Sequence, residues 1–295
     1  MKAIDLMCQM VTKWGSVITG EIAQQMESYL GTKLIYNKTD EEMAQMLRDA
    51  DVRVMVVTST MKPASSMMDI ASSTLDMEEM KEIHDRVFQF TKDHSDVIIG
   101  SWASISPKYG YKGLRELERC IKDLKFVGYF MTDMVSGVPH NDKSLYNYYD
   151  LCSEAGVPVR LLIGHTAGGA GTPGGGGIHL ERERPIPYLD DVAADFPNLK
   201  VIAAHCSWPW HNELISILLH KANVYAENHG WAPKYVPAEI KKEINGRLQD
   251  KFMFGSDFPL IPYERCFTEW DAELKPEAAE KMYYKNAQKV FGLKF

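Results

Sequence analysis

Closely spaced cysteine pairs are missing from this chain of 295 residues. Its five cysteines are scattered, odd in number and without a Cys-x-x-Cys motif: Cys8, Cys120, Cys152, Cys206 and Cys266. This pattern argues against a disulfide-stapled scaffold and against a cluster of thiolates around zinc. It favours a reducing compartment, so we expect the protein to be cytoplasmic.

The chain also lacks an excess of basic residues and a long apolar run. Its 33 Lys and Arg residues against 40 Asp and Glu residues give a net charge of −7. This balance argues against nucleic acid and anionic membrane as partners, and leaves a small-molecule substrate as the expected one. Asp5 interrupts the apolar N-terminal stretch, which therefore does not resemble a signal peptide, and no run reaches membrane-spanning length.

What the sequence does contain is a regular alternation of short apolar runs and helical patterns. Eight runs rich in β-branched and aliphatic residues predict strands at 2–7, 53–58, 97–101, 126–131, 157–163, 200–205, 223–227 and 251–255. Several are nearly all apolar, as expected of strands buried on both faces of a parallel sheet. Helical spacing predicts helices at 41–50, 77–93, 112–123, 143–155, 187–195, 212–221, 238–247 and 277–291.

This alternation predicts a single (β/α)8 TIM barrel over residues 1–295, because no break in composition marks a second domain. A doubly wound open sheet is the structural alternative, but no Gly-x-Gly-x-x-Gly motif follows a strand. Residues 11–38 form a long insertion after the first strand and are a candidate cap or lid. Residues 166–177, TAGGAGTPGGGG, form a glycine-rich loop after strand five. We favour a lid there over a phosphate cradle, because no Lys-Ser/Thr pair follows the glycines.

Ionisable residues stand at the ends of three predicted strands. His165 closes the fifth strand, His205 closes the sixth, and Asp257 follows the eighth in the segment FGSDFP. The active site of a (β/α)8 barrel lies at the C-terminal ends of its strands, so these side chains should meet at one mouth. A single strand-end histidine or aspartate is more often structural. Their joint placement predicts a shared catalytic site.

The second half of the chain resembles a known family. The segments RPIPYLDDVAADFPNLKVIAAHCSWPW (184–210), NVYAENHGWAPKY (223–235) and FMFGSDFPL (252–260) carry the resemblance. They are similar to the amidohydrolase superfamily, in the branch of aminocarboxymuconate-semialdehyde decarboxylase and the γ-resorcylate-type decarboxylases. The resemblance is specific over residues 157–295. Before residue 157 it lies in the order of strands and helices more than in sequence motifs.

The resemblance implies a divalent metal of zinc or manganese type. The family holds it by an HxH or ExH pair after strand one, a strand-five histidine and a strand-eight aspartate. His165 and Asp257 match the latter two ligands, and His205 matches the family's catalytic histidine. The strand-one pair falls on Met7 and Gln9, whose thioether and neutral amide are poor ligands for such an ion. We therefore favour a metal-free site, and relatives further imply a homodimer.

Without a metal, Asp257, His205 and His165 are the expected catalytic residues. A carboxyl group can move a proton, and imidazoles can polarise a carbonyl or stabilise an oxyanion. We expect a hydrolase of a C–O or C–N bond (lactone, ester or amide) in a small carboxylated or cyclic compound. The alternative is a non-oxidative decarboxylase of an aromatic or unsaturated acid, although such relatives use a metal. A non-catalytic binding protein is the third reading.

Further residues at strand ends are candidates for substrate binding: Met7, Gln9, Trp102, Tyr129 and His229. Because alternate residues of a strand share a face, Met7 and Gln9 should point to the same side and Cys8 toward the helices. Arg160 has opposite parity to His165 on the same predicted strand. We therefore expect Arg160 to face the helices and leave it out of the site.

Overall fold

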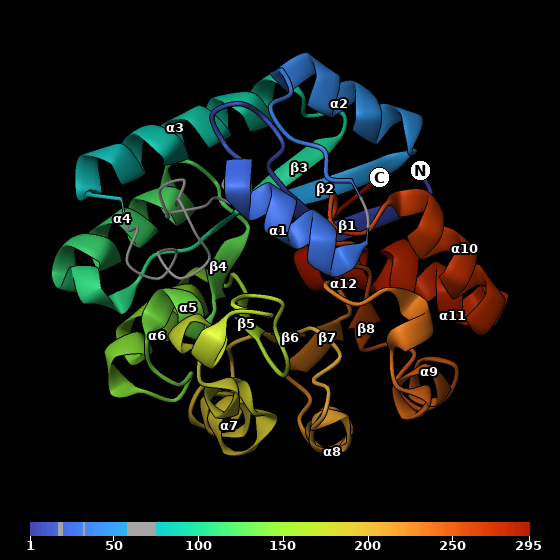
Figure 1. Cartoon of the computed structure of the whole chain (residues 1–295). Helices are drawn as coiled ribbons and strands as arrows, with labels where there is room; N and C mark the ends of the chain where they lie inside the picture. The colour runs from blue at the N-terminus through green and yellow to red at the C-terminus, as the bar shows by residue number, and fades with distance from the viewer. Residues whose placement is uncertain (17–19, 32, 58–74) are drawn as a thin grey trace.

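Eight parallel strands form one sheet in sequence order in the computed structural model, which describes residues 1–16, 20–31, 33–57 and 75–295 (Figure 1). The strands are β1 (Ala3–Gln9), β2 (Val52–Val57), β3 (Ile98–Ala103), β4 (Gly128–Met131), β5 (Val159–Leu162), β6 (Val201–Ala204), β7 (Val224–Glu227) and β8 (Phe252–Met253). The segment after β8 pairs with β1, through the bridge between Cys8 and Phe258, and this nearly closes the sheet. The predicted (β/α)8 barrel is confirmed.

Most helices surround the strands as an outer layer, and α1 lies across one end of the barrel (Figure 1). They are α1 (Gly20–Leu30), α2 (Asp40–Asp49), α3 (Met77–Asp93), α4 (Gly110–Lys122), α5 (Asp133–Ser136), α6 (Lys143–Ala155), α7 (Asp190–Asp195), α8 (His211–His220), α9 (Ala238–Ile244), α10 (Tyr263–Glu273), α11 (Pro276–Glu280) and α12 (Asn286–Phe291). Each predicted helix has a counterpart, and α1, α5 and α10 are additional. No helix in the described ranges is long and apolar enough to cross a membrane.

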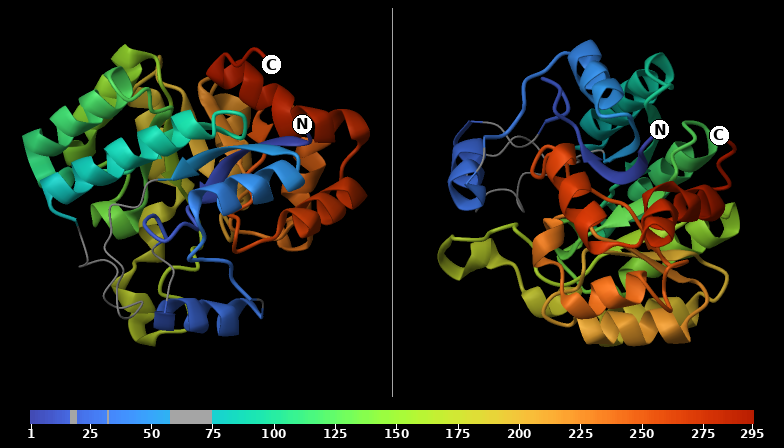
Figure 2. Two further views of the ribbon diagram at one scale, coloured as in Figure 1. Left: turned by 90° about the horizontal axis from the view of Figure 1, so that it is seen from above. Right: turned by 90° about the vertical axis from the view of Figure 1, so that its right-hand side faces the viewer.

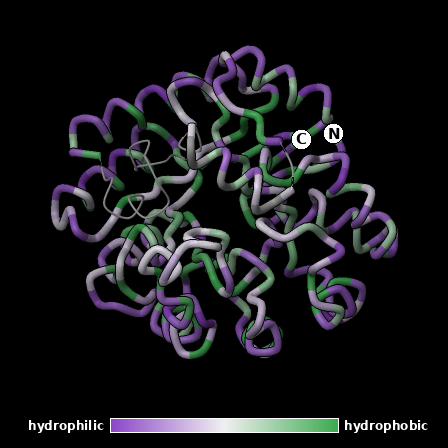
Figure 3. The backbone as a smooth tube through the Cα atoms, viewed as in Figure 1, coloured by the Kyte–Doolittle hydropathy of each residue, from purple (hydrophilic) through white to green (hydrophobic). Residues whose placement is uncertain are grey.

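Two buried clusters hold the barrel together. The inner cluster fills the barrel with side chains such as Leu6, Trp102, Phe130 and Leu162. A larger cluster fills the layer between strands and helices. Figure 3 shows the corresponding pattern, with hydrophobic strands inside and hydrophilic outer helix turns. Burial on both faces explains why the strands read as continuous apolar runs in the sequence.

A bulge in β1 sets the side chains at the barrel mouth. The register between β1 and β2 shifts between Asp5 and Cys8. Leu6 packs in the inner cluster, and the sulfur of the next residue, Met7, also contacts an inner side chain. Two consecutive residues therefore face inward, as an extra residue in a bulge permits. Beyond it, Gln9 faces inward and Cys8 belongs to the outer layer, as the parity of the sequence predicted.

The insertion after β1 and the glycine-rich loop after β5 lie at the same end of the barrel. Figure 2 shows α1 and the glycine-rich loop after β5 at the end where the strands finish. Three consecutive glycines in that loop, residues 174 to 176, have φ values of 64°, 61° and 63°. Such left-handed backbone is costly for residues with a Cβ atom, which explains the run of glycine here.

Candidate active site

Asp257 is held at the barrel mouth by the end of β1. Its backbone N–H donates to the Met7 carbonyl at 2.9 Å, and its carboxylate accepts from the Gln9 amide at 2.9 Å. The residue is buried and has a φ of 63°. Burial raises the pKa of Asp257 to about 7, and the Glu227 charge acts in the same direction, whereas the Gln9 hydrogen bond lowers it. The carboxyl group can therefore both release and accept a proton near neutral pH.

His205 is a neutral imidazole at the end of β6. Its Nδ1 lies 3.2 Å from the backbone oxygen of His165. A carbonyl only accepts, so Nδ1 carries the proton and Nε2 keeps its lone pair. Burial, together with the neighbouring His229, holds the pKa of His205 well below its usual value. This tautomer makes Nε2 an acceptor, rather than the donor to a carbonyl oxygen expected from the sequence.

Glu227 and His229 form a buried couple beside His205. The His229 Nδ1 lies 2.6 Å from one Glu227 carboxylate oxygen, and its backbone N–H donates to the other at 2.8 Å. The rings of His229 and His205 are 4.2 Å apart. The carboxylate thereby fixes the tautomer and orientation of His229. From the sequence we expected His229 only to bind substrate. The Glu-x-His spacing at the end of β7 was the feature from which the contact between Glu227 and His229 could have been predicted.

Arg160 lies inside the barrel, so the expectation that it faces the helices was wrong. Its guanidinium donates to the Leu6 carbonyl and to the Met7 sulfur, the latter at 2.7 Å. Its Nε lies 3.8 Å from the Glu227 carboxylate, and both residues are fully buried. The parity count failed because β5 ends at Leu162, and Gly164, with a φ of 82°, breaks the alternation before His165 is reached.

His165 contacts the array through its main chain. Its backbone oxygen accepts the His205 hydrogen bond, whereas its ring packs edge-on against Trp208 and Trp231, with centroids 5.6 Å and 6.1 Å away. The structure thus brings together Asp257, Gln9, Glu227, His229 and His205 through a chain of contacts and charges. The His165 side chain stands on the aromatic side of this array.

Two predicted pocket residues lie within the packed core. Trp102 is fully buried in the inner cluster, donates from Nε1 to the Leu6 carbonyl at 2.9 Å and packs against Phe291. Tyr129 donates to the Ile105 carbonyl at 2.7 Å and stacks on Tyr148 in the outer layer. Tyr129 therefore faces the helices and does not line the mouth. Its inward-facing neighbour on β4 is Phe130.

The donor set at the mouth does not fit the metal that the resemblance implies. The Met7 sulfur is engaged with Arg160, and the Gln9 amide with Asp257. Among the described residues, the ligand atoms of His165, His205 and Asp257 are not gathered into a potential metal-binding group, and the His165 ring packs against Trp208 and Trp231. A thioether and an amide do not compensate for that separation. We therefore derive no catalytic step through a metal at this site.

Gly230 leaves the space that the His205 imidazole occupies. A Cβ atom on Gly230 would lie 2.5 Å from the His205 Nε2, and the residue has a φ of 76°. We expect Gly230→Ala to displace the imidazole and lower kcat at least about tenfold, since small misplacements of catalytic groups are costly. Gly292→Ala is the matched control, because its φ is 67° and its Cβ would meet open space. Equal kinetics in the two variants would contradict this role of Gly230.

The comparisons with known proteins agree with this barrel. The family model described as amidohydrolase matches residues 33–293, and the chain belongs to this family. None of the curated proteins compared matches the chain.

Solved structures of similar shape cover almost the whole chain. An uncharacterized TIM-barrel protein from Bordetella bronchiseptica is 22% identical, with a TM-score of 0.72 and 99% of each chain covered. The 5-carboxyvanillate decarboxylase of Sphingomonas paucimobilis is 12% identical, with a TM-score of 0.65 and coverage of 99% of this chain and 98% of that one. The 4-oxalomesaconate hydratase of Rhodopseudomonas palustris is 15% identical, with a TM-score of 0.59 and coverage of 98% and 95%.

Proposed function

We propose that the barrel mouth hydrolyses a C–O or C–N bond of a small cyclic or carboxylated compound by acid–base chemistry of its own side chains. The observation that carries the proposal is the hydrogen bond from Gln9 to Asp257. It ties the strand-eight carboxylate to a neutral amide at the position where the family resemblance places a metal pair. The carboxylate is thereby held in place and keeps a proton-accepting oxygen.

Each residue then has a role that follows from its contacts. Asp257 takes the proton of a water molecule that attacks the substrate carbonyl, and returns this proton to the leaving oxygen or nitrogen. His205 accepts a hydrogen bond from the water at Nε2, because its Nδ1 proton is held by the His165 carbonyl. The Glu227–His229 couple packs against the His205 ring and restricts its orientation.

The pH dependence of kcat/KM tests the role of Asp257. The base must be ionised, so we expect kcat/KM on a lactone, ester or amide to rise with pH through a midpoint near 7, the pKa of Asp257. Gln9→Leu removes a hydrogen bond that lowers this pKa and should move the midpoint up. Glu227→Gln removes a charge that raises it and should move the midpoint down. Midpoints that do not move in either variant would exclude Asp257 as the titrating base.

A decarboxylase is the second candidate function. The likeness to a 5-carboxyvanillate decarboxylase favours it, although that likeness in itself concerns the fold. The two functions separate in one experiment. Incubation with lactones, esters and amides on one side, and with aromatic carboxylic acids on the other, should give acid release from the first panel. Carbon dioxide from the second panel alone would favour the decarboxylase, and binding without any product would favour a binding protein.

A further inference from the structure

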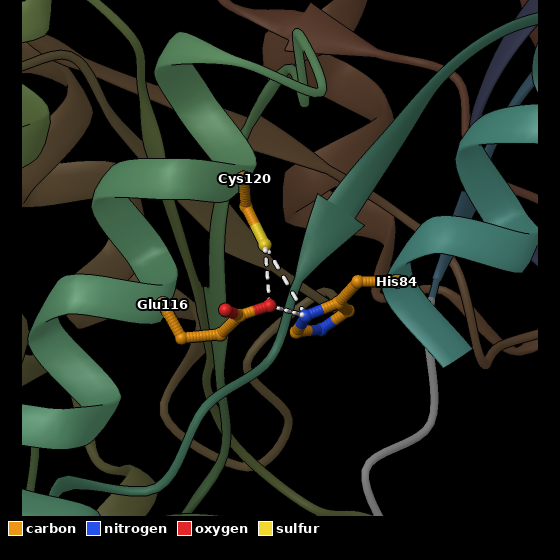
Figure 4. A group of neighbouring side chains, drawn as sticks. All are labelled: His84, Glu116 and Cys120. Atoms are coloured by element: carbon orange, nitrogen blue, oxygen red, sulfur yellow. Dashed lines mark hydrogen bonds and ion pairs between the residues drawn. The ribbon is translucent and has the colours of Figure 1, made fainter. Parts of the chain in front are cut away.

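A second group of chemically active side chains lies outside the barrel, between α3 and α4 (Figure 4). His84 comes from α3, while Glu116 and Cys120 lie one turn apart on α4. All three side chains are buried. His84 Nδ1 lies 2.7 Å from Glu116 Oε1 and 3.2 Å from Cys120 Sγ, and the sulfur lies 3.7 Å from the same oxygen.

We propose that His84, Glu116 and Cys120 bind a divalent transition-metal ion of the zinc class. An imidazole nitrogen, a carboxylate oxygen and a thiolate sulfur are the three donor types that zinc takes in proteins. Tetrahedral bonds of about 2.0–2.3 Å place ligand atoms roughly 3.3–3.7 Å apart. The observed separations are 2.7, 3.2 and 3.7 Å, so an ion would have to widen the shortest of them, between His84 Nδ1 and Glu116 Oε1, by about 0.6 Å.

The surrounding charges are compatible with a divalent ion. Arg119 donates to both oxygens of Glu116, at 2.9 Å and 2.8 Å, and to Asp85 at 2.5 Å. Each carboxylate oxygen has two acceptor positions, so Glu116 Oε1 can keep Arg119 and still bind an ion. Asp85 offsets the charge of Arg119. A Glu116 carboxylate and a Cys120 thiolate then balance the two charges of the ion.

An aromatic ring and a surface groove border the cluster. The ring of His84 packs edge-on against Phe126, with centroids 5.5 Å apart, which limits its rotation, and its Nε2 is buried with no hydrogen-bond partner among the described residues. Glu116 and Arg119 line a groove of about 670 Å³ on the outer face of α3 and α4. A metal site requires a path from solvent, and this groove reaches the cluster at Glu116, whereas His84 and Cys120 lie behind it and are fully buried. The fourth position of the ion would then be filled from this groove by water.

Cobalt(II) provides the probe, because a thiolate–cobalt bond gives a charge-transfer absorption band. We expect this band to grow to one equivalent when chelator-treated protein is titrated with cobalt, and to disappear when zinc is added. Cys120→Ser should lose the band. Cys152→Ser is the matched control, because Cys152 is also a buried free cysteine on a helix, and it should keep the band.

Two further variants complete the test. His84→Gln should also lose the band while retaining the thiol, and circular dichroism establishes that each variant is folded. Asp257→Asn should retain the band, which separates this site from the chemistry at the barrel mouth. A wild-type protein without a band, or a band that persists in folded Cys120→Ser or His84→Gln, would overturn the proposal.

Discussion

Asp257→Asn is expected to lower kcat by about 10²- to 10⁴-fold, the usual contribution of a positioned acid–base group. The amide has the shape of the carboxyl group, but it cannot take a proton from water. Asn also tolerates left-handed backbone, so the φ of 63° at this position should not unfold the variant. Steady-state kinetics on the best substrate of the lactone, ester and amide panel measure the effect.

Asp51→Asn is the matched control for this substitution. Asp51 also has a left-handed φ, of 54°, but it lies before β2 and pairs with the amino terminus of the chain. We expect its kcat to remain that of the wild type. Turnover by folded Asp257→Asn within a few-fold of this control would remove Asp257 from the catalytic residues.

Arg160→Met is expected to lower the free energy of unfolding by about 3–5 kcal/mol, because it leaves one partner of a buried ion pair without its countercharge. Both Arg160 and Glu227 are fully buried. Methionine retains most of the volume of the side chain, so the loss reports the charge more than a cavity. Chemical denaturation monitored by tryptophan fluorescence measures it.

The same variant has a second, kinetic readout. Arg160 lowers the pKa of Asp257, so its removal should move the midpoint of the pH–rate profile up. Arg115→Met is the control, since Arg115 pairs with Glu118 at 3.2 Å on the solvent-facing side of α4, with 64% and 28% of the two side chains exposed. Exposed pairs contribute little. A loss of stability in Arg160→Met no larger than in this control would show that the inner pair does not stabilise the barrel.

The fold was predictable because a strand that is buried on both faces is apolar at nearly every position. Runs such as the one that became β2 (Val52–Val57) are almost entirely apolar, and the helices between them follow regular spacing. Helix α10 was missed because it begins after Pro262 with no side-chain cap at its first turn. The start signal on which such a prediction relies was therefore missing.

The site was only partly predictable, because side-chain direction depends on local breaks in strand geometry. Asp257 and Gln9 could be placed at the mouth from strand ends and parity, and the hydrogen bond between them fits that placement. Arg160 could not, because the alternation ends before His165 at a glycine with left-handed backbone. Likewise, the sequence of β1 contains no signal for the bulge that lets the consecutive residues Leu6 and Met7 both face inward.

The cluster of His84, Glu116 and Cys120 shows the same limit for contacts between helices. Glu116 and Cys120 share one face of α4 by their spacing of four residues. Nothing in the sequence shows that His84, 32 positions away from Glu116, packs against that face. Contacts of this kind arise from the docking of neighbouring helices in the barrel and become visible only in three dimensions.

Turnover after removal of metal tests the central claim most directly. The Cys120→Ser variant should be used, so that an ion bound by the cluster of His84, Glu116 and Cys120 does not affect the measured turnover. Elemental analysis should establish that chelation is complete. If Asp257 and His205 act without a metal, the stripped protein should hydrolyse its best lactone, ester or amide at the untreated rate. Loss of turnover that zinc or manganese restores would contradict the account.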